Sequence, residues 1–455
     1  MKVALVFPRY KYPSGDAPLG LLYIASYLKS NSLAELDVID TTFHSSKHQA
    51  AALLARKDYD LVGFSLMTTM LKDALLLASI LKKSNPKVRV VFGGPHPTVM
   101  PEETLREGCV DAVVIGEGEQ TWLDLVNSAG DFSKVKGLWF KSSGSIVKNP
   151  KREFIPDLDK LPFPDLQLVD LPSYFDHWFQ LDSVGKNLRG VNIISSRGCP
   201  YKCSFCQPTL TTLFGQRIRK RSPENIVAEL RHWKRLLGIN AFMFQDDTLI
   251  FDKDWVSRIC DKLIESNLGL VFGANARANL VDYDIFALLK KAGLRKVFMG
   301  IESGSQRVLD EVYDKGITLR QVKKAVKVFN SLGIKVQGYF MIGAPSETLE
   351  EIKQTIRFST SLGIDEATFS ITTPLPHTFL FDKNSHLISA DVADFDYYRN
   401  PVFSGKEVLP KAKLVHLKQR ALLSFYLHPK HLLPTIRGFL TPSALKKSLV
   451  KLKRF

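Results

Sequence analysis

The stretch that decides the fold is Ser195-Ser196-Arg197-Gly198-Cys199-Pro200-Tyr201-Lys202-Cys203-Ser204-Phe205-Cys206. It follows an apolar run, residues 191–194, that is typical of a buried strand. Gly198 and Pro200 interrupt the strand pattern, so we expect the three thiols on a loop at the carboxyl end of the strand. Three thiolates on so short a loop can bind one face of a metal or of an iron–sulfur cluster. No fourth cysteine lies nearby, which leaves one metal position open.

A structural zinc site is the alternative that three cysteines leave open, but it needs a fourth protein ligand. Cys109 falls in a preceding domain, and Cys260 falls on a buried position of an expected helix, where a free cysteine is common. Zinc sites also usually contain paired two-cysteine knuckles, which this sequence lacks. The spacing therefore favours an iron–sulfur cluster over zinc or unligated thiols.

The bulk composition is that of an ordinary globular protein. A length of 455 residues predicts about two or three domains. Five cysteines, three of them clustered, are too few for a disulfide framework and favour a reducing cytosol. The first apolar stretch stops at Pro8, so it predicts a strand rather than a signal peptide. No window reaches the roughly 20 apolar residues of a membrane span. We therefore expect a cytoplasmic protein.

Residues 1–135 alternate between strand and helix patterns. Strands are expected at 3–7, 36–40, 61–65, 88–92 and 112–116, with helices at 19–28 and 74–81. Strands separated by helices at this spacing predict a Rossmann-like parallel sheet with right-handed crossovers.

Ligands of such sheets bind beyond the carboxyl ends of the strands. Small or polar residues follow four of these ends: Asp40, Ser65, Gly93-Gly94, and Gly116 to Glu119, which includes Glu117. Glycines there allow a bulky ligand to approach the backbone. Each cluster alone could be an ordinary tight turn, but four at consecutive strand ends favour a shared ligand crevice. The sequence has no Gly-rich phosphate fingerprint, so a nucleotide is not favoured.

A connector, residues 136–190, and a second alternation, residues 191–390, follow. The connector is expected to contain a hairpin of 137–140 with 150–154. Later strands are expected at 191–194, 241–244, 270–277, 296–303, 335–343 and 366–370. A complete eight-unit barrel usually needs about 250 residues, so the shorter span predicts a partial (β/α)6 barrel.

Polar residues again follow the strands of this second domain: Gln245, Asp246 and Asp247, then Asn275 and Arg277, then Glu302 and Ser303. Taken singly, an aspartate here is typical of a helix cap or turn, and Arg277 is typical of a surface charge. In a parallel barrel all of them converge on the mouth that holds the cysteines, which favours a functional interpretation.

Residues 391–455 form a helical basic extension. From Lys406 to Phe455 the sequence holds twelve Lys or Arg residues and one acid, Glu407, which is most of the net charge of +16. A basic amphipathic end predicts peripheral contact with the inner face of a membrane. The alternative is a solvated helix packed on the barrel. Nucleic acid is not favoured as a partner, because aromatic residues are not interleaved with these charges.

The Cys-x3-Cys-x2-Cys spacing, with Phe205 directly before the last cysteine, resembles the radical S-adenosylmethionine (radical SAM) superfamily. Residues 300–305 and 338–348 look like the fourth- and fifth-strand segments of that superfamily. Residues 1–130 resemble the cobalamin-binding domain that precedes the barrel in one large subgroup. The matching stretches there are residues 18–21, 65–66, 93–96 and 116–119. The resemblance extends to about residue 430.

The resemblance implies a [4Fe–4S] cluster bound by Cys199, Cys203 and Cys206, with S-adenosylmethionine (SAM) on the open iron. One electron from the cluster then cleaves SAM to methionine and a 5′-deoxyadenosyl radical, which abstracts a substrate hydrogen.

The resemblance also assigns cofactor contacts by position in the motifs. Gln245, Asp246 and Asp247 are placed for the amino end of the methionine, Arg277 for its carboxylate, Glu302 or Ser303 for the ribose hydroxyls, and the backbone around Phe205 for adenine. Ser65, Gly93, Gly94 and Glu117 are placed for cobalamin.

One departure from the family pattern concerns the protein ligand of the cobalt atom. Many cobalamin-binding domains carry an Asp-x-His-x-x-Gly pattern on the first strand–helix loop, and residues 8–20 contain no histidine. His44 follows the second strand and is expected to be a solvated loop residue; His96 follows the fourth. Either cobalamin binds without a protein histidine on cobalt, or the domain has lost it. The glycine clusters favour binding.

The leading hypothesis is a radical SAM enzyme that functionalises an unactivated carbon by cobalamin-dependent methyl transfer. An alternative in the same superfamily is radical cyclisation, oxidation or rearrangement of a lipid or tetrapyrrole without methyl transfer. An alternative of another class is a non-catalytic iron–sulfur or corrinoid carrier. The expected partners are a small-molecule or lipid substrate and an electron donor such as flavodoxin or ferredoxin.

Overall fold

The chain forms two compact units in the computed structural model, which describes residues 1–44, 46–396, 398 and 400–432. Unit 1 consists of Met1–His177, Pro208–Lys220 and Val392–Asp394. Unit 2 consists of Trp178–Gln207, Arg221–Asp391 and the described residues from Phe395 onward. The last part of the basic tail, residues 433–455, lies outside the described residues, so the expectation about it stays a prediction.

Unit 1 is built on a seven-stranded sheet with the order β2-β1-β3-β4-β5-β6-β7. Its strands are β1 (Lys2–Phe7), β2 (Glu35–Asp40), β3 (Leu61–Ser65), β4 (Arg89–Gly93), β5 (Ala112–Val114), β6 (Leu138–Ser142) and β7 (Ser145–Lys148). The first five are parallel, which confirms the predicted Rossmann-like sheet. Its larger helices are α1 (Leu19–Asn31), α2 (Lys47–Ala55), α3 (Leu71–Ser84) and α6 (Glu119–Asn127).

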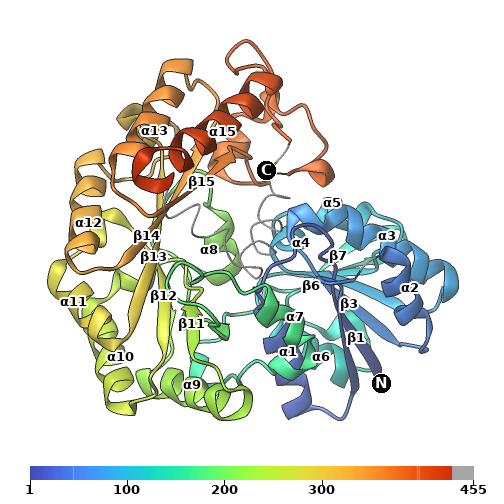
Figure 1. The fold of residues 1–455 in the computed structure, drawn as a ribbon. Coiled ribbons are helices and arrows are strands. Elements are labelled where there is room, and N and C mark those ends of the chain that lie inside the picture. The colour runs from blue at the N-terminus through green and yellow to red at the C-terminus, as the bar shows by residue number, and fades with distance from the viewer. Residues whose placement is uncertain (45, 397, 399, 433–455) are drawn as a thin grey trace. The chain divides into compact units, whose positions relative to one another are not determined.

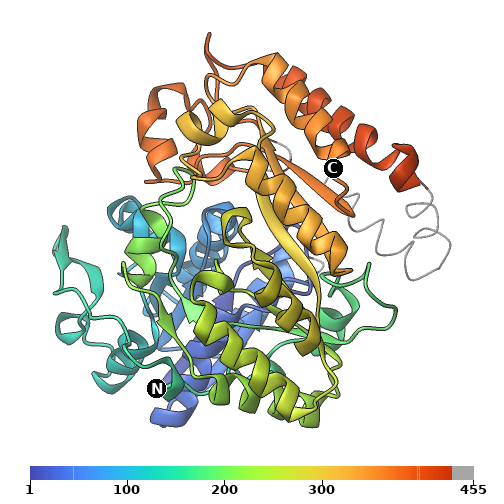
Figure 2. The ribbon, with the colours of Figure 1, turned by 90° about the vertical axis from the view of Figure 1, so that its left-hand side faces the viewer.

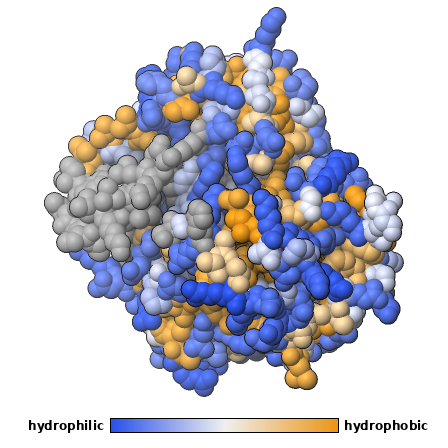
Figure 3. Space-filling model, turned by 90° about the vertical axis from the view of Figure 1, so that its right-hand side faces the viewer, coloured by the Kyte–Doolittle hydropathy of each residue, from blue (hydrophilic) through white to orange (hydrophobic). Residues whose placement is uncertain are grey.

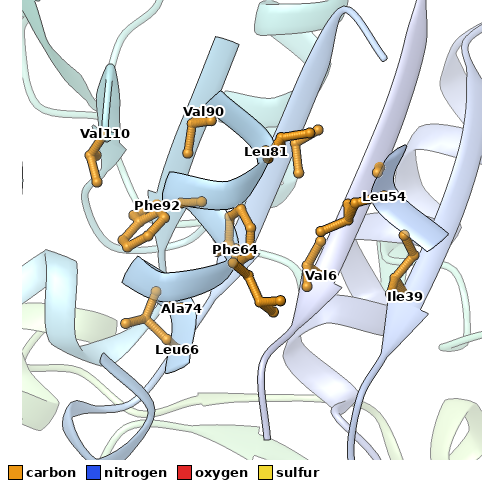
Figure 4. Close-up of a cluster of buried hydrophobic side chains, with 14 of the residues drawn as sticks. Val6, Ile39, Leu54, Phe64, Leu66, Ala74, Leu81, Val90, Phe92 and Val110 are labelled. Carbon is orange, nitrogen blue, oxygen red and sulfur yellow. The ribbon is translucent and has the colours of Figure 1, made fainter. Parts of the chain in front are cut away.

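Each face of this sheet carries its own hydrophobic core. On one face, Val6, Phe64 and Phe92 pack with Leu54 of α2 and Leu81 of α3 (Figure 4). The opposite face packs against α1 and α6. Such a doubly wound sheet leaves the carboxyl ends of its strands open as the place for a ligand.

Gly63 in β3 is required by the second of these cores. A Cβ at this position would lie 2.2 Å from Cζ2 of Trp122, far closer than atoms can approach. The glycine therefore allows the buried Trp122 indole to lie directly against the strand.

The connector contributes to unit 1. β6 and β7 pair as an antiparallel hairpin, and β6 pairs with β5, so the hairpin extends the sheet. The second hairpin strand, expected at 150–154, lies at 145–148 instead. Ser143 (φ 48°) and Gly144 (φ 80°) both have positive φ, as a two-residue type I′ turn requires, and this turn fixes the earlier start. Farther along, the Tyr174 hydroxyl donates to Asp40 at 2.6 Å, which attaches α7 (Leu171–Asp176) to the end of β2.

Unit 2 is a six-stranded parallel sheet with a simple sequential order, β15-β14-β13-β12-β11-β8. Its strands are β8 (Gly190–Ile193), β11 (Ala241–Phe244), β12 (Val271–Ala276), β13 (Leu294–Glu302), β14 (Lys335–Ile342) and β15 (Glu366–Ile371). Because β8 and β15 are the two edges, the barrel is open, and the predicted six-unit partial barrel is confirmed. The connecting helices line its outer face (Figure 1): α9 (Pro223–Leu237), α10 (Lys253–Ser266), α11 (Tyr283–Ala292), α12 (Leu319–Ser331) and α13 (Leu349–Ser361).

Local sequence signals fix where these helices begin. The Ser222 hydroxyl accepts the Asn225 N–H at 3.1 Å at the start of α9, as expected from its Ser-Pro sequence. α12 and α13 each begin with a capping box, at Thr318 and Thr348. Each cap ends the preceding loop at a defined residue, so the loops at the barrel mouth have fixed lengths.

A C-terminal helix, α15 (Lys411–Tyr426), covers the edge of the barrel, where it packs on β15 and α13 (Figures 1 and 2). Its last residue, Tyr426, donates its hydroxyl to the carbonyl of Ala367 at 2.9 Å and accepts the Ala367 N–H at 3.4 Å. The hydroxyl thereby satisfies backbone groups that an edge strand leaves unpaired.

The protein surface is mixed in character. On the face shown in Figure 3, hydrophobic residues form small patches among hydrophilic ones. Among the described residues, none of the helices combines the length and the apolar character that crossing a bilayer requires.

Candidate active site

The cysteine loop follows β8 and is held by its own hydrogen bonds. The carbonyl of Cys203 accepts the N–H groups of Cys206 and Gln207, both at 3.0 Å. The Gln207 side-chain amide donates to the Tyr201 carbonyl at 3.0 Å, which closes the loop from the other side. Gly198 has φ 107°, a conformation that favours glycine at the point where the chain leaves the strand.

All three thiols of this loop are free, with Cys203 buried and Cys199 and Cys206 half-buried. Among the described residues, no three His, Cys, Asp or Glu side chains converge as ligands of one metal ion would. A single zinc ion needs that convergence, whereas an iron–sulfur cluster takes each thiolate on a different iron. Three thiols on one loop therefore provide the ligands for three irons of a cluster. Burial raises the pKa of Cys206 to about 12, so bound iron would have to stabilise its thiolate.

Asp246 is a positioning residue of this loop. It follows β11, is buried, and accepts the backbone N–H of Ser195 at 3.1 Å and the Ser195 hydroxyl at 2.8 Å. It also accepts the hydroxyl of Ser196. Because these donors occupy both carboxylate oxygens, the geometry does not support the contact with the amino group of SAM that its sequence position predicted.

The two neighbours of Asp246 differ from it. The N–H of Gln245 donates to the Ile193 carbonyl at 2.9 Å, which places Gln245 beside the end of β8, and its side chain is half-buried. Asp247 is exposed. The surrounding protein and, to a smaller extent, the charge of Asp246 raise the pKa of Asp247 to about 6. Asp247 is therefore the carboxylate of the pair that an incoming ligand can reach.

Arg277, which follows β12, lies against the cysteine loop. Its Nη1 donates to Sγ of Cys203 at 3.4 Å, and its guanidinium lies 3.8 Å from the ring centroid of Tyr201. Its Nε is buried and has no hydrogen-bond partner among the described residues. The sequence predicted Arg277 near the site, and in the structure its guanidinium contacts the thiol of Cys203, a cysteine of the motif.

Glu302 lies at the end of β13 in a strained conformation. Its φ is 66°, and the register with β14 shifts between Gly300 and Glu302. Its Oε1 accepts Nζ of Lys315 at 2.7 Å in a buried ion pair. A Cβ at Gly300 would lie 2.4 Å from this carboxylate oxygen, so the glycine makes room for the pair. Strained residues of this kind are concentrated at functional sites.

Ser303, the alternative to Glu302 for a ribose hydroxyl, points elsewhere. It is fully buried, and its hydroxyl lies 3.2 Å from that of Thr355 in α13 and accepts the Ser305 N–H at 3.1 Å. These contacts hold the loop after β13 on the helix layer. Of the two residues, Glu302 is the one whose position suits the site.

Phe205 and its surroundings show what sequence reasoning missed. Phe205 packs edge-on against Tyr313 with ring centroids 5.5 Å apart, and Nζ of Lys315 lies 5.3 Å from its ring centroid. Ser204 donates its N–H to the Tyr313 carbonyl at 2.9 Å. Tyr313 and Lys315 follow a short π-helical segment, Val308–Val312, and such segments are frequent at functional sites. Nothing in the sequence marks the helix as π, so both residues were overlooked.

Two further contacts were not predicted. The hydroxyl of Thr248 lies 3.6 Å from Sγ of Cys199. The N–H groups of Phe379 and Leu380, at the start of α14 (Phe379–Lys383), donate to the carbonyls of Gln207 and Ser204, both at 2.8 Å. The segment after β15 therefore returns to the cysteine loop, a long-range contact that sequence spacing cannot reveal.

The residues assigned to cobalamin lie in unit 1 and fall into two groups. Ser65, Gly93 and Gly94 meet at the ends of β3 and β4, where a Cβ at Gly94 would lie 3.3 Å from the Ser65 hydroxyl. A Cβ at Gly93 would meet only Val114, at 3.5 Å, so its absence leaves space for a ligand. The Glu117 carboxylate instead accepts hydrogen bonds from the Arg219 guanidinium and from the Ile155 N–H, each at 2.8 Å. It thereby links segments of unit 1 that are far apart in the sequence.

His44 differs from the expectation of a solvated side chain. It is half-buried, its Nδ1 is buried without a hydrogen-bond partner among the described residues, and burial lowers its pKa. His96 is buried, with Nδ1 3.1 Å from the Thr68 hydroxyl, and burial lowers its pKa to about 4. His96 is therefore a neutral core residue.

Comparison with known proteins identifies the family. Residues 15–126 match the B12 binding domain, and residues 193–359 match the Radical SAM superfamily. An uncharacterized methyltransferase of Pyrococcus horikoshii is 34% identical over 463 residues, which cover 98% of this chain and 97% of that protein. The chain belongs to the cobalamin-binding radical SAM family. It is an enzyme of that family, whose cofactors are a [4Fe–4S] cluster, SAM and cobalamin.

Other relatives of this radical SAM protein differ in reaction. An anaerobic magnesium-protoporphyrin IX monomethyl ester cyclase of Rubrivivax gelatinosus is 29% identical and covers 88% of this chain and 72% of its own. A cytidylyl-2-hydroxyethylphosphonate methyltransferase of Streptomyces wedmorensis is 26% identical, with coverage of 82% and 80%.

Solved structures show the same fold. The radical SAM methyltransferase TsrM of Kitasatospora setae superposes with a TM-score of 0.70 at 20% identity, and the match covers 85% of this chain and 78% of that one. The cobalamin-dependent radical enzyme OxsB superposes with a TM-score of 0.67 at 22% identity, with coverage of 84% and 55%.

Proposed function

We propose that this enzyme transfers a methyl group to an unactivated carbon of a small molecule in a cobalamin-dependent radical reaction. Support comes from the relative named a methyltransferase, which matches 98% of the chain. The observation that carries the proposal is the joint presence of a three-thiol loop in unit 2 and an accessible glycine edge at β4 in unit 1. When bound, the cluster and SAM supply a 5′-deoxyadenosyl radical, and cobalamin supplies the methyl group.

The residues of unit 2 have distinct tasks in this proposal. Cys199, Cys203 and Cys206 hold the cluster, and Asp246 holds the chain segment that leads to them. Asp247, which a ligand can reach, binds the ammonium group of SAM, because a carboxylate above pH 6 is ionised and attracts it. Glu302, fixed by Lys315, accepts from the ribose hydroxyls.

The test is an anaerobic assay of the protein reconstituted with iron, sulfide and cobalamin, reduced with dithionite and supplied with SAM. We expect both 5′-deoxyadenosine and S-adenosylhomocysteine, because one SAM gives the radical and a second gives the methyl group. The control is Cys203→Ala, which removes a cluster ligand. Absence of 5′-deoxyadenosine above that control would mean a carrier protein rather than a radical enzyme.

Radical cyclisation, oxidation or rearrangement is the second candidate, favoured by the cyclase relative that matches 88% of the chain. This chemistry consumes SAM only to form the radical. The same assay would then yield 5′-deoxyadenosine without S-adenosylhomocysteine, so the ratio of the two products decides between the candidates.

A lipid is the substrate class that the C-terminal helix supports. Leu423 on α15 and Leu427 directly after it are 59% and 60% exposed, and Arg420 is exposed one turn before Leu423. An exposed apolar pair beside a cation suits the interface of an anionic membrane. The wild-type protein should therefore float together with vesicles of phosphatidylglycerol and phosphatidylcholine. The Leu423→Gln/Leu427→Gln variant should not float with them. The matched control is Leu236→Gln, which alters an exposed leucine of α9; equal flotation of all three proteins would remove the idea.

A further inference from the structure

We propose that Arg277 sets the reduction potential of the iron–sulfur cluster by donating a hydrogen bond to the thiolate of Cys203. The proposal rests on the proposed function only in taking the three cysteines as cluster ligands. It gives Arg277 a role different from the contact with the SAM carboxylate that its sequence position implies.

Three neighbours hold the Arg277 guanidinium at the cysteine loop. Nη1 lies 3.4 Å from Sγ of Cys203, a normal distance for a hydrogen bond to sulfur. The planar group stacks on Tyr201, with 3.8 Å between Cζ and the ring centroid. Gly316, with φ 62°, lies against it, because a Cβ there would be in ordinary contact with Nη2 at 3.5 Å. Stacking restricts the guanidinium plane, so the N–H direction toward the sulfur is fixed before any cofactor binds.

The charge of Arg277 is not neutralised by a neighbouring carboxylate. It forms no ion pair with a described residue, whereas Lys315, another cation near the cysteines, is paired with Glu302 at 2.7 Å. The pairing cancels much of the field that Lys315 exerts at Cys206. Of the two cations, Arg277 therefore has the larger net effect on the cluster, and it acts through Cys203.

The direction of the effect follows from the charge change on reduction. One electron, from dithionite or a protein donor, enters the oxidised cluster, and the cluster and its thiolates become more negative by one charge. A cationic hydrogen-bond donor stabilises the more negative state more strongly, because charge-assisted hydrogen bonds strengthen with the charge of the acceptor. Hydrogen bonds to the sulfur atoms are one of the ways in which proteins set cluster potentials. Arg277 therefore raises the potential and makes the electron easier to accept.

The experiment measures the potential without SAM and without substrate. Wild-type protein, Arg277→Met and Arg277→Lys are reconstituted anaerobically, and the electron paramagnetic resonance signal of the reduced cluster is followed against the applied potential, per mole of bound iron. We expect Arg277→Met to shift the midpoint to a more negative potential and Arg277→Lys to shift it less, because the ammonium keeps the charge but loses the planar stack. Arg320→Gln, an exposed arginine of α12, is the matched control and should leave the potential unchanged.

Two results would overturn the proposal. An unchanged midpoint in Arg277→Met, together with weaker SAM binding, would assign Arg277 to the SAM carboxylate. If Arg277→Met fails to hold a cluster, Arg277→Lys and Tyr201→Leu decide, and unchanged midpoints in both would equally reject it. Failure of the proposed function looks different: wild-type protein would have a normal cluster potential and yield no S-adenosylhomocysteine.

Discussion

The two adjacent carboxylates at the barrel mouth, those of Asp246 and Asp247, have different surroundings. Asp246 is enclosed by the donors of Ser195 and Ser196, and Asp247 is exposed. A buried anion with several donors is costly to disturb, because the removal of its charge leaves those donors unsatisfied. Asp246 therefore stabilises the approach to the cysteine loop, and Asp247 remains available to a ligand.

Replacing Asp246 by asparagine tests this division. Asp246→Asn puts an amide N–H₂ where a serine donor now points, so the cysteine loop should loosen and the iron and sulfide content after reconstitution should fall several-fold. Asp247→Asn changes the neighbouring carboxylate and should keep full cluster content. Iron and sulfide analysis of both variants checks this. Equal cluster content in the two would contradict a positioning role for Asp246.

A second buried carboxylate, Glu347, makes stability depend on pH. Its Oε2 accepts the N–H groups of Gly343 and Ala344, its Oε1 has no partner among the described residues, and burial raises its pKa to about 8. A carboxyl group whose folded pKa lies above its unfolded value stabilises the fold only while it is protonated. The free energy of unfolding should therefore fall as the pH rises from about 4.5 to about 8, by at most roughly 5 kcal/mol.

Glu347→Gln removes this titration and should flatten the pH dependence. Urea unfolding of the metal-free protein at pH 5.5, 7 and 8.5 measures it. Glu350→Gln, on the exposed side of α13, is the control and should follow the wild type. A wild-type curve that rises between pH 5.5 and 8.5 would show that the Glu347 carboxylate is stabilised rather than penalised by its surroundings.

At the scale of elements, α15 belongs to the barrel although its sequence is that of a basic tail. It covers the edge strand β15, and the hydroxyl of Tyr426 bonds both backbone groups of Ala367. A chain shortened to about Pro410 would uncover β15 and lose these contacts. Membrane binding is therefore better tested by surface substitutions in α15 than by truncation.

Removing the Tyr426 hydroxyl should weaken this edge. Tyr426→Phe keeps the ring but leaves two backbone groups without their partner, at a cost of about 1–2 kcal/mol. Denaturant unfolding measures the loss, and faster hydrogen exchange of the Ala367 amide would locate it. Tyr283→Phe, at a half-exposed position of α11, should have no effect. If the Ala367 amide exchanged at the same rate in Tyr426→Phe and in Tyr283→Phe, the Tyr426 hydroxyl would not be protecting the edge strand.

At the scale of the whole molecule, the two cofactor sites belong to units with separate cores. The core of unit 1 is formed by both faces of its own sheet, so the loss of the cluster in unit 2 should leave unit 1 folded. The cofactors can therefore be removed one at a time.

Two substitutions should separate them. Cys203→Ala should bind cobalamin like the wild type and produce no 5′-deoxyadenosine. Gly94→Val should lose cobalamin and keep its iron, because Gly94 has φ 93° and a Cβ there would lie 3.0 Å from the backbone of Leu66. Cobalt and iron analysis of the purified variants checks both expectations. Loss of both metals in either variant would show that the sites depend on each other.

The sequence alone was sufficient to predict the alternation of strands and helices, and it supplied three candidate ligands for the cluster. Alternating strand and helix patterns predicted both parallel sheets because buried strands and capped helices such as α9 are encoded by neighbouring residues. The cysteine motif was readable for the same reason, since its three thiols lie within one loop.

Only the tertiary structure separated the contacts and the burial of the polar residues at the barrel mouth. Position after a strand could not separate Asp246 from Asp247, or Glu302 from Ser303, because side-chain direction depends on donors that lie far away in the chain. Sequence position also could not predict the ion pair of Lys315 with Glu302 or the hydrogen bond of Arg277 to Cys203. The residues of each pair are brought together only by the packing of the fold. Local sequence specifies the elements of this protein, and long-range contacts between the elements specify the chemistry at their ends.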